Sequence, residues 1–189
     1  ACKRGHLKVV KMLLAVGGIQ VNQADGDGFT PLNIACHGGH LKVVELLLAA
    51  DGIQVNQPDY EGTTPLSTAC MNGHLKIVEL LLAVDGIQVN QADNNRCTPL
   101  YVACQEGHLK VVKRLLPVKS IQVNQATNQG FTPLMIAIWE SRVDIVIQFL
   151  QHGMGHNNII DFFRINKIKP SGRIALYKYA LLLPQQHQP

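Results

Sequence analysis

Four histidines recur at one position of the sequence and are the first side chains to consider as metal ligands. His6, His40, His74 and His108 each follow a glycine, at a spacing of 34 residues. A metal ion needs all its protein ligands within about 2 Å of itself, whereas packed helices lie about 8 to 10 Å apart. No second ligand type recurs beside these histidines. We therefore predict that they serve the scaffold and hold no metal.

Cysteines recur in the same register and could form disulfides or carry thiol chemistry. Cys2, Cys36, Cys70 and Cys104 share one position, and their Cα atoms should lie about 10 Å apart between units, beyond the roughly 7 Å that a disulfide tolerates. We predict small buried side chains there. Cys97 lies in a loop instead, which makes it a candidate reactive thiol. Five cysteines are too sparse for a disulfide scaffold and favour a reducing compartment.

Other patterns that support catalysis are missing from the sequence. His152 and His156 have the spacing of a helical zinc pair, but Gly153 and Gly155 argue against a helix there, and no His-Glu-x-x-His motif is present. There is no Walker loop, no Gly-x-Gly-x-x-Gly after a strand and no Gly-x-Ser-x-Gly. The acidic residues are scattered singly. We expect a protein that is not an enzyme, with no catalytic residue, no cofactor and no small-molecule substrate.

The elements that must position these residues repeat with the same period. The motifs Thr-Pro-Leu and Ile-Gln-Val-Asn-Gln each occur four times in one register. After Thr30, whose hydroxyl can cap a helix, Pro31 occupies the first turn and a short helix is predicted over 32–38. A second helix is predicted over 41–49, and it is apolar over most of its circumference.

Helices this short are unstable alone because helix nucleation is costly, and an apolar second helix needs neighbours to cover it. Stacking similar units meets both needs, which is the principle of a solenoid. We therefore expect an array over 1–161 followed by a tail over 162–189. The units of the array are a partial repeat 1–27, three repeats 28–61, 62–95 and 96–129, and a diverged end repeat 130–161.

The pattern Gly-x-Thr-Pro-Leu-x-x-Ala-x-x-x-Gly-His-Leu-x-Val-Val-x-Leu-Leu-Leu, followed by Val-Asn, resembles the ankyrin repeat over about 1–160. The resemblance implies an all-α fold with short hairpin loops, an ankyrin-repeat α-solenoid of helix-turn-helix units. It also implies a non-catalytic scaffold that holds a protein partner in a concave groove of finger tips and first helices. The sequence departs from the family in its period of 34 residues instead of about 33, and in lacking the histidine that usually follows Thr-Pro-Leu.

Composition and length narrow the class of protein. The chain has 189 residues, of which 47% are hydrophobic and 16% charged, enough apolar surface for a folded core. No apolar run reaches the roughly 18 to 20 residues of a membrane helix, and no signal-peptide pattern is present. We expect an intracellular, cytoplasmic protein. Because Ala1 aligns with Ala35 inside a unit, the alternative is the recognition module of a larger enzyme or effector.

Comparison of the units with one another predicts the binding surface. Positions that stay the same serve the fold, whereas positions that change are free to serve a ligand. Changes concentrate in the fingers and the first helices, which by resemblance line the groove. The residues predicted to contact the protein partner are Phe29, Asn33, His37, Tyr60, Glu61, Thr63, Ser67, Met71, Asn94, Asn95, Tyr101, Gln105, Phe131, Met135 and Trp139. Drift after a recent duplication would produce the same variation, and Trp139 could instead belong to the core.

The charge of the chain is unevenly distributed. Residues 1–161 carry 12 basic and 13 acidic residues, and residues 162–189 carry 5 basic and no acidic ones, which together give the net +4. A basic tail could contact nucleic acid or an anionic membrane, but its bases are spread out, so we rank this alternative below the groove. The stretch 174–183 is predicted to form a helix that caps the last unit.

Overall fold

The computed structural model describes residues 1–153, and the helices in this range follow one another in pairs. Within these residues there is no β-strand, so the expected all-α fold class is confirmed. A short 3-10 helix, η1, precedes the first long helix. The elements are η1 (Cys2–Arg4), α1 (Leu7–Leu14), α2 (Pro31–His37), α3 (Leu41–Leu48), α4 (Pro65–Met71), α5 (Leu75–Leu82), α6 (Pro99–Glu106), α7 (Leu109–Leu115), α8 (Pro133–Trp139) and α9 (Val143–Gln151).

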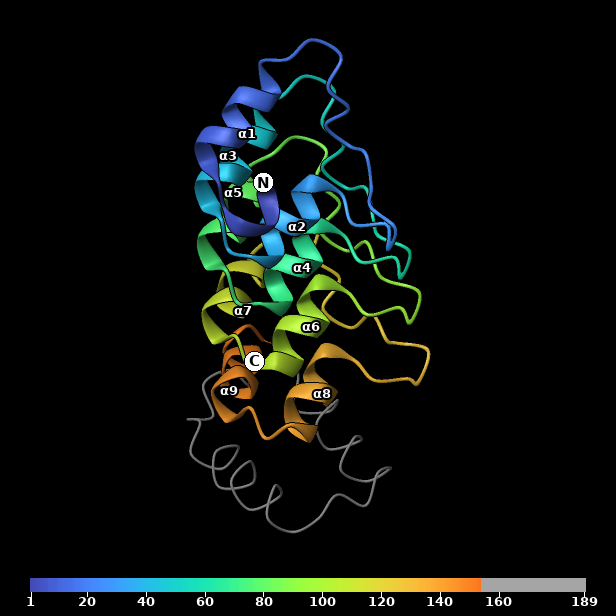
Figure 1. Ribbon diagram of the computed structural model, residues 1–189. Coiled ribbons are helices and arrows are strands. Elements are labelled where there is room, and N and C mark those ends of the chain that lie inside the picture. Colours follow the sequence, from blue (N-terminus) through green and yellow to red (C-terminus); the bar gives the residue numbers. More distant parts are fainter. Residues whose placement is uncertain (154–189) are drawn as a thin grey trace.

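The helices form two parallel columns in an elongated stack (Figure 1). One column holds the first helices of the units, α2, α4, α6 and α8, and each packs against the next. The other holds the second helices, α1, α3, α5, α7 and α9, which pack against one another in the same order. Long loops project from the side of the first helices that faces away from the second helices (Figure 1). The hydrophobic core therefore runs along the whole stack.

The first helices begin where a threonine and a proline stand together. The Thr30 hydroxyl accepts a hydrogen bond from the Asn33 N–H at 3.1 Å, and Pro31 occupies the first helical position. The same bond forms at Thr64, Thr98 and Thr132. The threonine satisfies an N–H that the helix cannot pair itself, so the predicted cap is confirmed in every described first helix. The helix starts one residue before its predicted start at residue 32.

The second helices are stabilised by the burial of their aliphatic side chains against neighbouring helices. In α3, Val43, Val44 and Leu47 are fully buried, whereas Lys42 and Glu45 form an exposed ion pair at 2.8 Å. Exposed pairs of this kind contribute little to stability, and burial of each large aliphatic side chain contributes about 1.5 to 3 kcal/mol. Packing between units is therefore the main source of stability of these short helices, as the sequence predicts.

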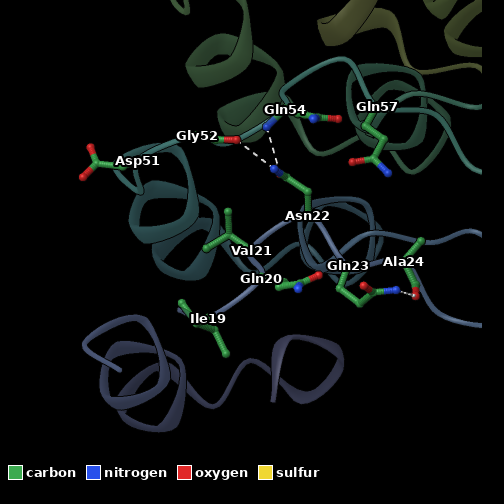
Figure 2. A pocket seen from close by; sticks show the side chains of 10 residues that line it. All are labelled: Ile19, Gln20, Val21, Asn22, Gln23, Ala24, Asp51, Gly52, Gln54 and Gln57. Carbon is green, nitrogen blue, oxygen red and sulfur yellow. Dashed lines mark hydrogen bonds between the residues drawn. The ribbon is translucent and has the colours of Figure 1, made fainter. Parts of the chain in front are cut away.

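An asparagine that recurs at the same position of successive units joins the loops of adjacent units. The Asn22 side chain donates to the Gly52 carbonyl at 2.7 Å and accepts from the Gln54 N–H at 2.9 Å (Figure 2). Asn56 and Asn90 make the equivalent pair of bonds to their own next unit. One side chain thus pairs two backbone groups of a neighbouring loop, which explains why the Val-Asn step recurs in the sequence.

The recurring Gly-His histidines form a second set of bonds between units. His74 Nε2 lies 3.1 Å from the His37 carbonyl, and His40 and His108 reach backward in the same way. A carbonyl can only accept, so Nε2 carries the proton in each of these rings. In the last unit Arg142 replaces the histidine, and its guanidinium donates to the equivalent carbonyl at 3.0 and 3.1 Å. The predicted scaffold role is confirmed for these three histidines.

The glycine of the Gly-His motif is explained by the same contact. Gly39 has a φ of 69°, a left-handed conformation that glycine adopts without strain. A Cβ on Gly39 would also lie 2.7 Å from the His74 ring, and a Cβ on Gly73 would lie 2.5 Å from the His108 ring. Each glycine therefore leaves room for the histidine of the following unit. The predicted capping helix over 174–183 lies outside the described residues.

Candidate functional site

The loops that join each second helix to the next first helix are the fingers, and they project to one side of the stack (Figure 1). Their ranges are 15–30, 49–64, 83–98 and 116–132. In the second finger, Asp59 accepts from the Glu61 N–H at 2.9 Å and the Thr63 N–H at 2.8 Å. Asp25 and Asp93 hold their fingers alike. A short acceptor side chain that binds nearby N–H groups is a common way to fix a turn.

Adjacent fingers are also joined by backbone bonds. The Asn94 N–H donates to the Glu61 carbonyl at 2.9 Å, and the Asn128 N–H donates to the Asn95 carbonyl at 3.0 Å. The Asn94 side chain donates to the Tyr60 carbonyl at 3.0 Å. Asn94 and Asn95 are both exposed. The Asn94 side chain also holds the adjacent finger through its bond to the Tyr60 carbonyl. The finger tips are therefore fixed relative to one another.

Three large apolar side chains are exposed on the finger side of the stack. Tyr60 is 72% exposed at a finger tip, while Met71 at 39% and Trp139 at 58% stand at the last residue of α4 and of α8. The Trp139 ring meets Phe131 edge-on, with ring centroids 5.9 Å apart. The alternative that Trp139 belongs to the core is therefore wrong. Of the other predicted contacts, His37 and Glu61 are exposed, and the half-buried ones are Phe29, Thr63, Gln105, Phe131 and Met135.

Three of the predicted contact residues are wrong, because their side chains are buried. Asn33 is 0% exposed, Ser67 2% and Tyr101 6%. They share the third position of their first helices, where the backbone N–H bonds to the capping threonine and the side chain is enclosed. The side-chain amide nitrogen of Asn33 lies 3.5 Å from the Gln57 carbonyl oxygen. A buried side chain has no surface to offer a partner, so variation between units does not by itself mark exposure.

The environment of Tyr101 agrees with its burial. Burial, and after it the negative charges that Cys97, Glu140 and Asp93 can carry, raise the pKa of the Tyr101 hydroxyl to about 12. The hydroxyl thus stays protonated at neutral pH. Tyr101 is a packing residue of the first-helix column.

Comparison with known proteins identifies the family. A family model described as ankyrin repeats, in three copies, matches residues 1–93 and 86–161. The chain belongs to the ankyrin repeat family. Ankyrin repeats generally mediate protein–protein interactions, and the family is typically non-catalytic. A search of curated proteins found no significant match to this ankyrin chain. Among the described residues, no helix has the length and apolar character required to span a bilayer.

The cysteines of this ankyrin array are held as neutral thiols. Burial raises the pKa of Cys36, Cys70 and Cys104 well above the ordinary value, and all three are 0% exposed. Burial, followed by the charge and hydrogen bond of Asp93, raises the pKa of Cys97 to about 11. Because the thiolate is the nucleophile, this raised pKa disfavours Cys97 as a reactive thiol at neutral pH. The predicted burial of the recurring cysteines is confirmed for these three members.

Alkylation of Cys97 at pH 8 is expected to be slow, and Asp93→Asn should speed it severalfold. Removing the carboxylate charge lowers the pKa of the thiol, and each unit of pKa changes the thiolate fraction about tenfold at this pH. Asparagine keeps an oxygen for the Asn95 and Cys97 N–H groups. The rate is measured with iodoacetamide by mass spectrometry of the peptide containing Cys97, with Cys97→Ser as the control for assignment. Equal rates in both proteins would show that the Asp93 charge does not act on the thiol.

The described part of the ankyrin array holds no side-chain cluster typical of a metal site. Across residues 1–153, no three His, Cys, Asp or Glu side chains come together in a way that could hold a metal ion. Two of its cavities, of about 530 and 550 Å³, lie at the first junction between units. The first is lined mainly by loop residues (Figure 2), with Asp51 as its titratable group, and Lys11 joins Asp51 in the second.

Proposed function

We propose that this ankyrin array binds a protein partner through its finger-side surface. This surface comprises the finger tips and the exposed ends of the first helices. It keeps the predicted contact residues that are not buried, which are Phe29, His37, Tyr60, Glu61, Thr63, Met71, Asn94, Asn95, Gln105, Phe131, Met135 and Trp139. The observation that carries the proposal is that large apolar side chains are exposed at positions where the units differ.

The last positions of the first helices illustrate the argument. One position holds His37, Met71, Gln105 and Trp139 in successive units, and three of these side chains are exposed. The preceding residue, for example Cys36, is cysteine in three units and fully buried in each. The fold therefore requires a buried apolar side chain at one position, where α8 has Ile138, and leaves the next position free. Side chains that change while the fold stays the same can serve recognition.

Trp139 is the strongest candidate anchor on this surface. An indole that is 58% exposed in the free protein leaves a large apolar area in contact with water. The edge-on contact with Phe131 restricts the ring before binding, which lowers the entropy cost of association. Aromatic side chains and methionine are enriched at protein interfaces, and tryptophan is prominent among binding hot spots. A partner that covers Trp139 and Met71 would gain most of its affinity there.

Trp139→Ala is expected to weaken binding of the partner about tenfold or more and to leave the melting temperature nearly unchanged. A buried interface tryptophan often contributes about 2 kcal/mol or more, whereas its truncation in the free protein opens no cavity. The partner is isolated on the immobilised chain, and its affinity for each variant is measured by calorimetry. Lys42→Ala, on the exposed side of α3, is the matched control and should bind like the wild type.

Two results would contradict the finger-side surface as the binding site. Binding that is unchanged in Trp139→Ala and Met71→Ala would remove its main anchors. Binding that disappears on deletion of residues 162–189 and falls steeply with salt would instead favour the basic tail, since contacts to phosphate groups are salt-dependent. The tail itself lies outside the described residues.

A further inference from the structure

The unit that contains α7 carries a different charge pattern from the two units before it. Four positions on and just after the second helix hold Lys, Glu, Leu and Asp in each of those earlier units, for a net charge of −1. In the unit of α7 the same positions hold only basic residues, for a net charge of +4, and all four side chains are exposed. We call these residues the basic stripe, and they are Lys110, Lys113, Arg114 and Lys119.

The basic residues of α7 replace side chains that stabilise the earlier second helices. α3 and α5 each have an ion pair between a lysine and the glutamate three residues later, at 2.8 and 2.9 Å. In α7 Lys113 stands at the position of the glutamate, so it brings a like charge to the side of the helix that carries Lys110. Arg114 replaces a leucine that is half-buried against the core in α3 and α5. Bases in the last turn complement the helix dipole, but Lys119 lies beyond the helix, so the dipole does not account for the whole stripe.

The basic stripe lies on the outer side of the second-helix column, away from either end of the described stack (Figure 1). α7 packs against α5 on one side and α9 on the other, so described helices flank the stripe on both sides. Within residues 1–153 its side chains form no ion pair. Residues 154–189 contain five basic residues and one acidic residue, Asp161. The chain therefore holds little negative charge that could neutralise the stripe.

The narrow width of the stripe selects the kind of partner. The equivalent positions carry a net charge of −1 in the unit before and in the unit after, and they include the exposed Asp85 and Asp144. A flat anionic membrane would also bring its headgroups against these acids, and facing like charges disfavour association. Single-stranded nucleic acids stack their bases on aromatic side chains, which residues 109–120 lack. An acidic segment laid along α7 would meet the bases and avoid the acids.

We propose that the basic stripe binds an acidic segment of a partner protein that lies along α7. Asp or Glu side chains of the segment pair with the four bases, and Arg114 can hold one carboxylate through two parallel N–H bonds. The stripe lies on the opposite side of the stack from the fingers (Figure 1). Its partner therefore does not compete with a partner bound at the finger-side surface, and either surface can act without the other.

The proposal is tested by titrating two peptides into the isotopically labelled full chain and recording its amide NMR signals. The peptides share one sequence except at four positions, three or four residues apart, which hold Glu in one peptide and Gln in the other. The Glu peptide should shift the signals of residues 109–120 and bind at least about tenfold more tightly than the Gln peptide, because it alone can form ion pairs with the stripe. This preference should shrink at high salt.

Variants of the chain locate the peptide on the stripe. Lys113→Glu with Lys119→Asp introduces the residues of the earlier units, and it should weaken binding of the Glu peptide at least about tenfold because two attractions become repulsions. Its melting temperature should not fall, since two neighbouring units fold with these residues. Lys8→Glu with Lys11→Glu, at exposed positions of α1, changes the net charge equally. It should bind like the wild type, because α1 is three units away and charges are screened over about 10 Å.

Any of four results would overturn the proposal. The first is that the Glu peptide binds no more tightly than the Gln peptide, or that neither binds. The second is an equal loss of affinity in the α1 variant and in the stripe variant. The third is binding of phosphatidylserine vesicles or of a DNA duplex, but not of the Glu peptide, that the stripe variant abolishes. The fourth is self-association of the chain that the stripe variant abolishes, since it would assign the stripe to a second copy.

Discussion

Tyr101→Ala is expected to lower the free energy of unfolding by about 3 kcal/mol, near the loss usual for a buried aromatic residue. The ring is 6% exposed in α6, which packs against both α4 and α8. Truncation would leave a cavity between these first helices, and the closely packed core cannot fully collapse around it. Urea denaturation followed by circular dichroism measures the loss.

Two matched variants separate the contribution of the buried ring to stability from that of the hydroxyl group and from that of ring size alone. Tyr101→Phe keeps the ring and should change stability by less than about 1 kcal/mol, because only the hydroxyl is lost. Trp139→Ala removes a larger ring from an exposed position and should also cost less than about 1 kcal/mol. A Tyr101→Ala protein as stable as the wild type would mean that the side chain is not a packing residue.

Leu81→Ala should lower the free energy of unfolding by about 3 kcal/mol, whereas Leu13→Ala at the equivalent position should cost less than about 1 kcal/mol. Leu81 is 0% exposed in α5, and Leu13 is 43% exposed in α1. The two changes remove the same atoms, so the difference between them measures the cavity and the burial provided by neighbouring units. Equal losses would show that burial by neighbouring units does not set the cost of the substitution.

Leu81→Ala should also reduce the cooperativity of unfolding. Stability in a repeat array depends on each unit and its interfaces with its neighbours, so a weakened central unit can uncouple the two ends. Trp139 is the single tryptophan of the chain and stands in α8, so its fluorescence reports the later units while circular dichroism reports all helices. The two unfolding curves should coincide in the wild type and separate in Leu81→Ala.

Most of the fold could be predicted from the sequence because its determinants are local and repeated. Thr30 caps α2 through a side chain three residues from its partner, and Pro31 sets the first turn. Gly39 follows the end of α2 with a positive φ. The family resemblance agrees with the fold that these local signals predict. The family match confirms the ankyrin repeats over 1–93 and 86–161. The bonds from Asn22 and His74 to other units could not be predicted, because they join residues at least 30 apart.

The candidate site was predicted less well than the fold. Comparison of units correctly marked Tyr60, Met71 and Trp139 as variable, and the structure shows that they are exposed. The same comparison marked Asn33 and Tyr101, which are buried. Variation shows only that the fold accepts several side chains at a position, and a buried position can accept them as well as an exposed one.

The sequence by itself determined the period, the helix pairs, their caps and the absence of recognisable catalytic motifs, because each depends on residues close together in the chain. Only the tertiary structure decided which variable side chains are exposed and which chemically similar helices are covered. Leu13 and Leu81 occupy the same place in the repeat and differ in exposure. The physical reason is that burial depends on what a neighbouring unit places against a side chain, and that neighbour lies a full repeat away in the sequence.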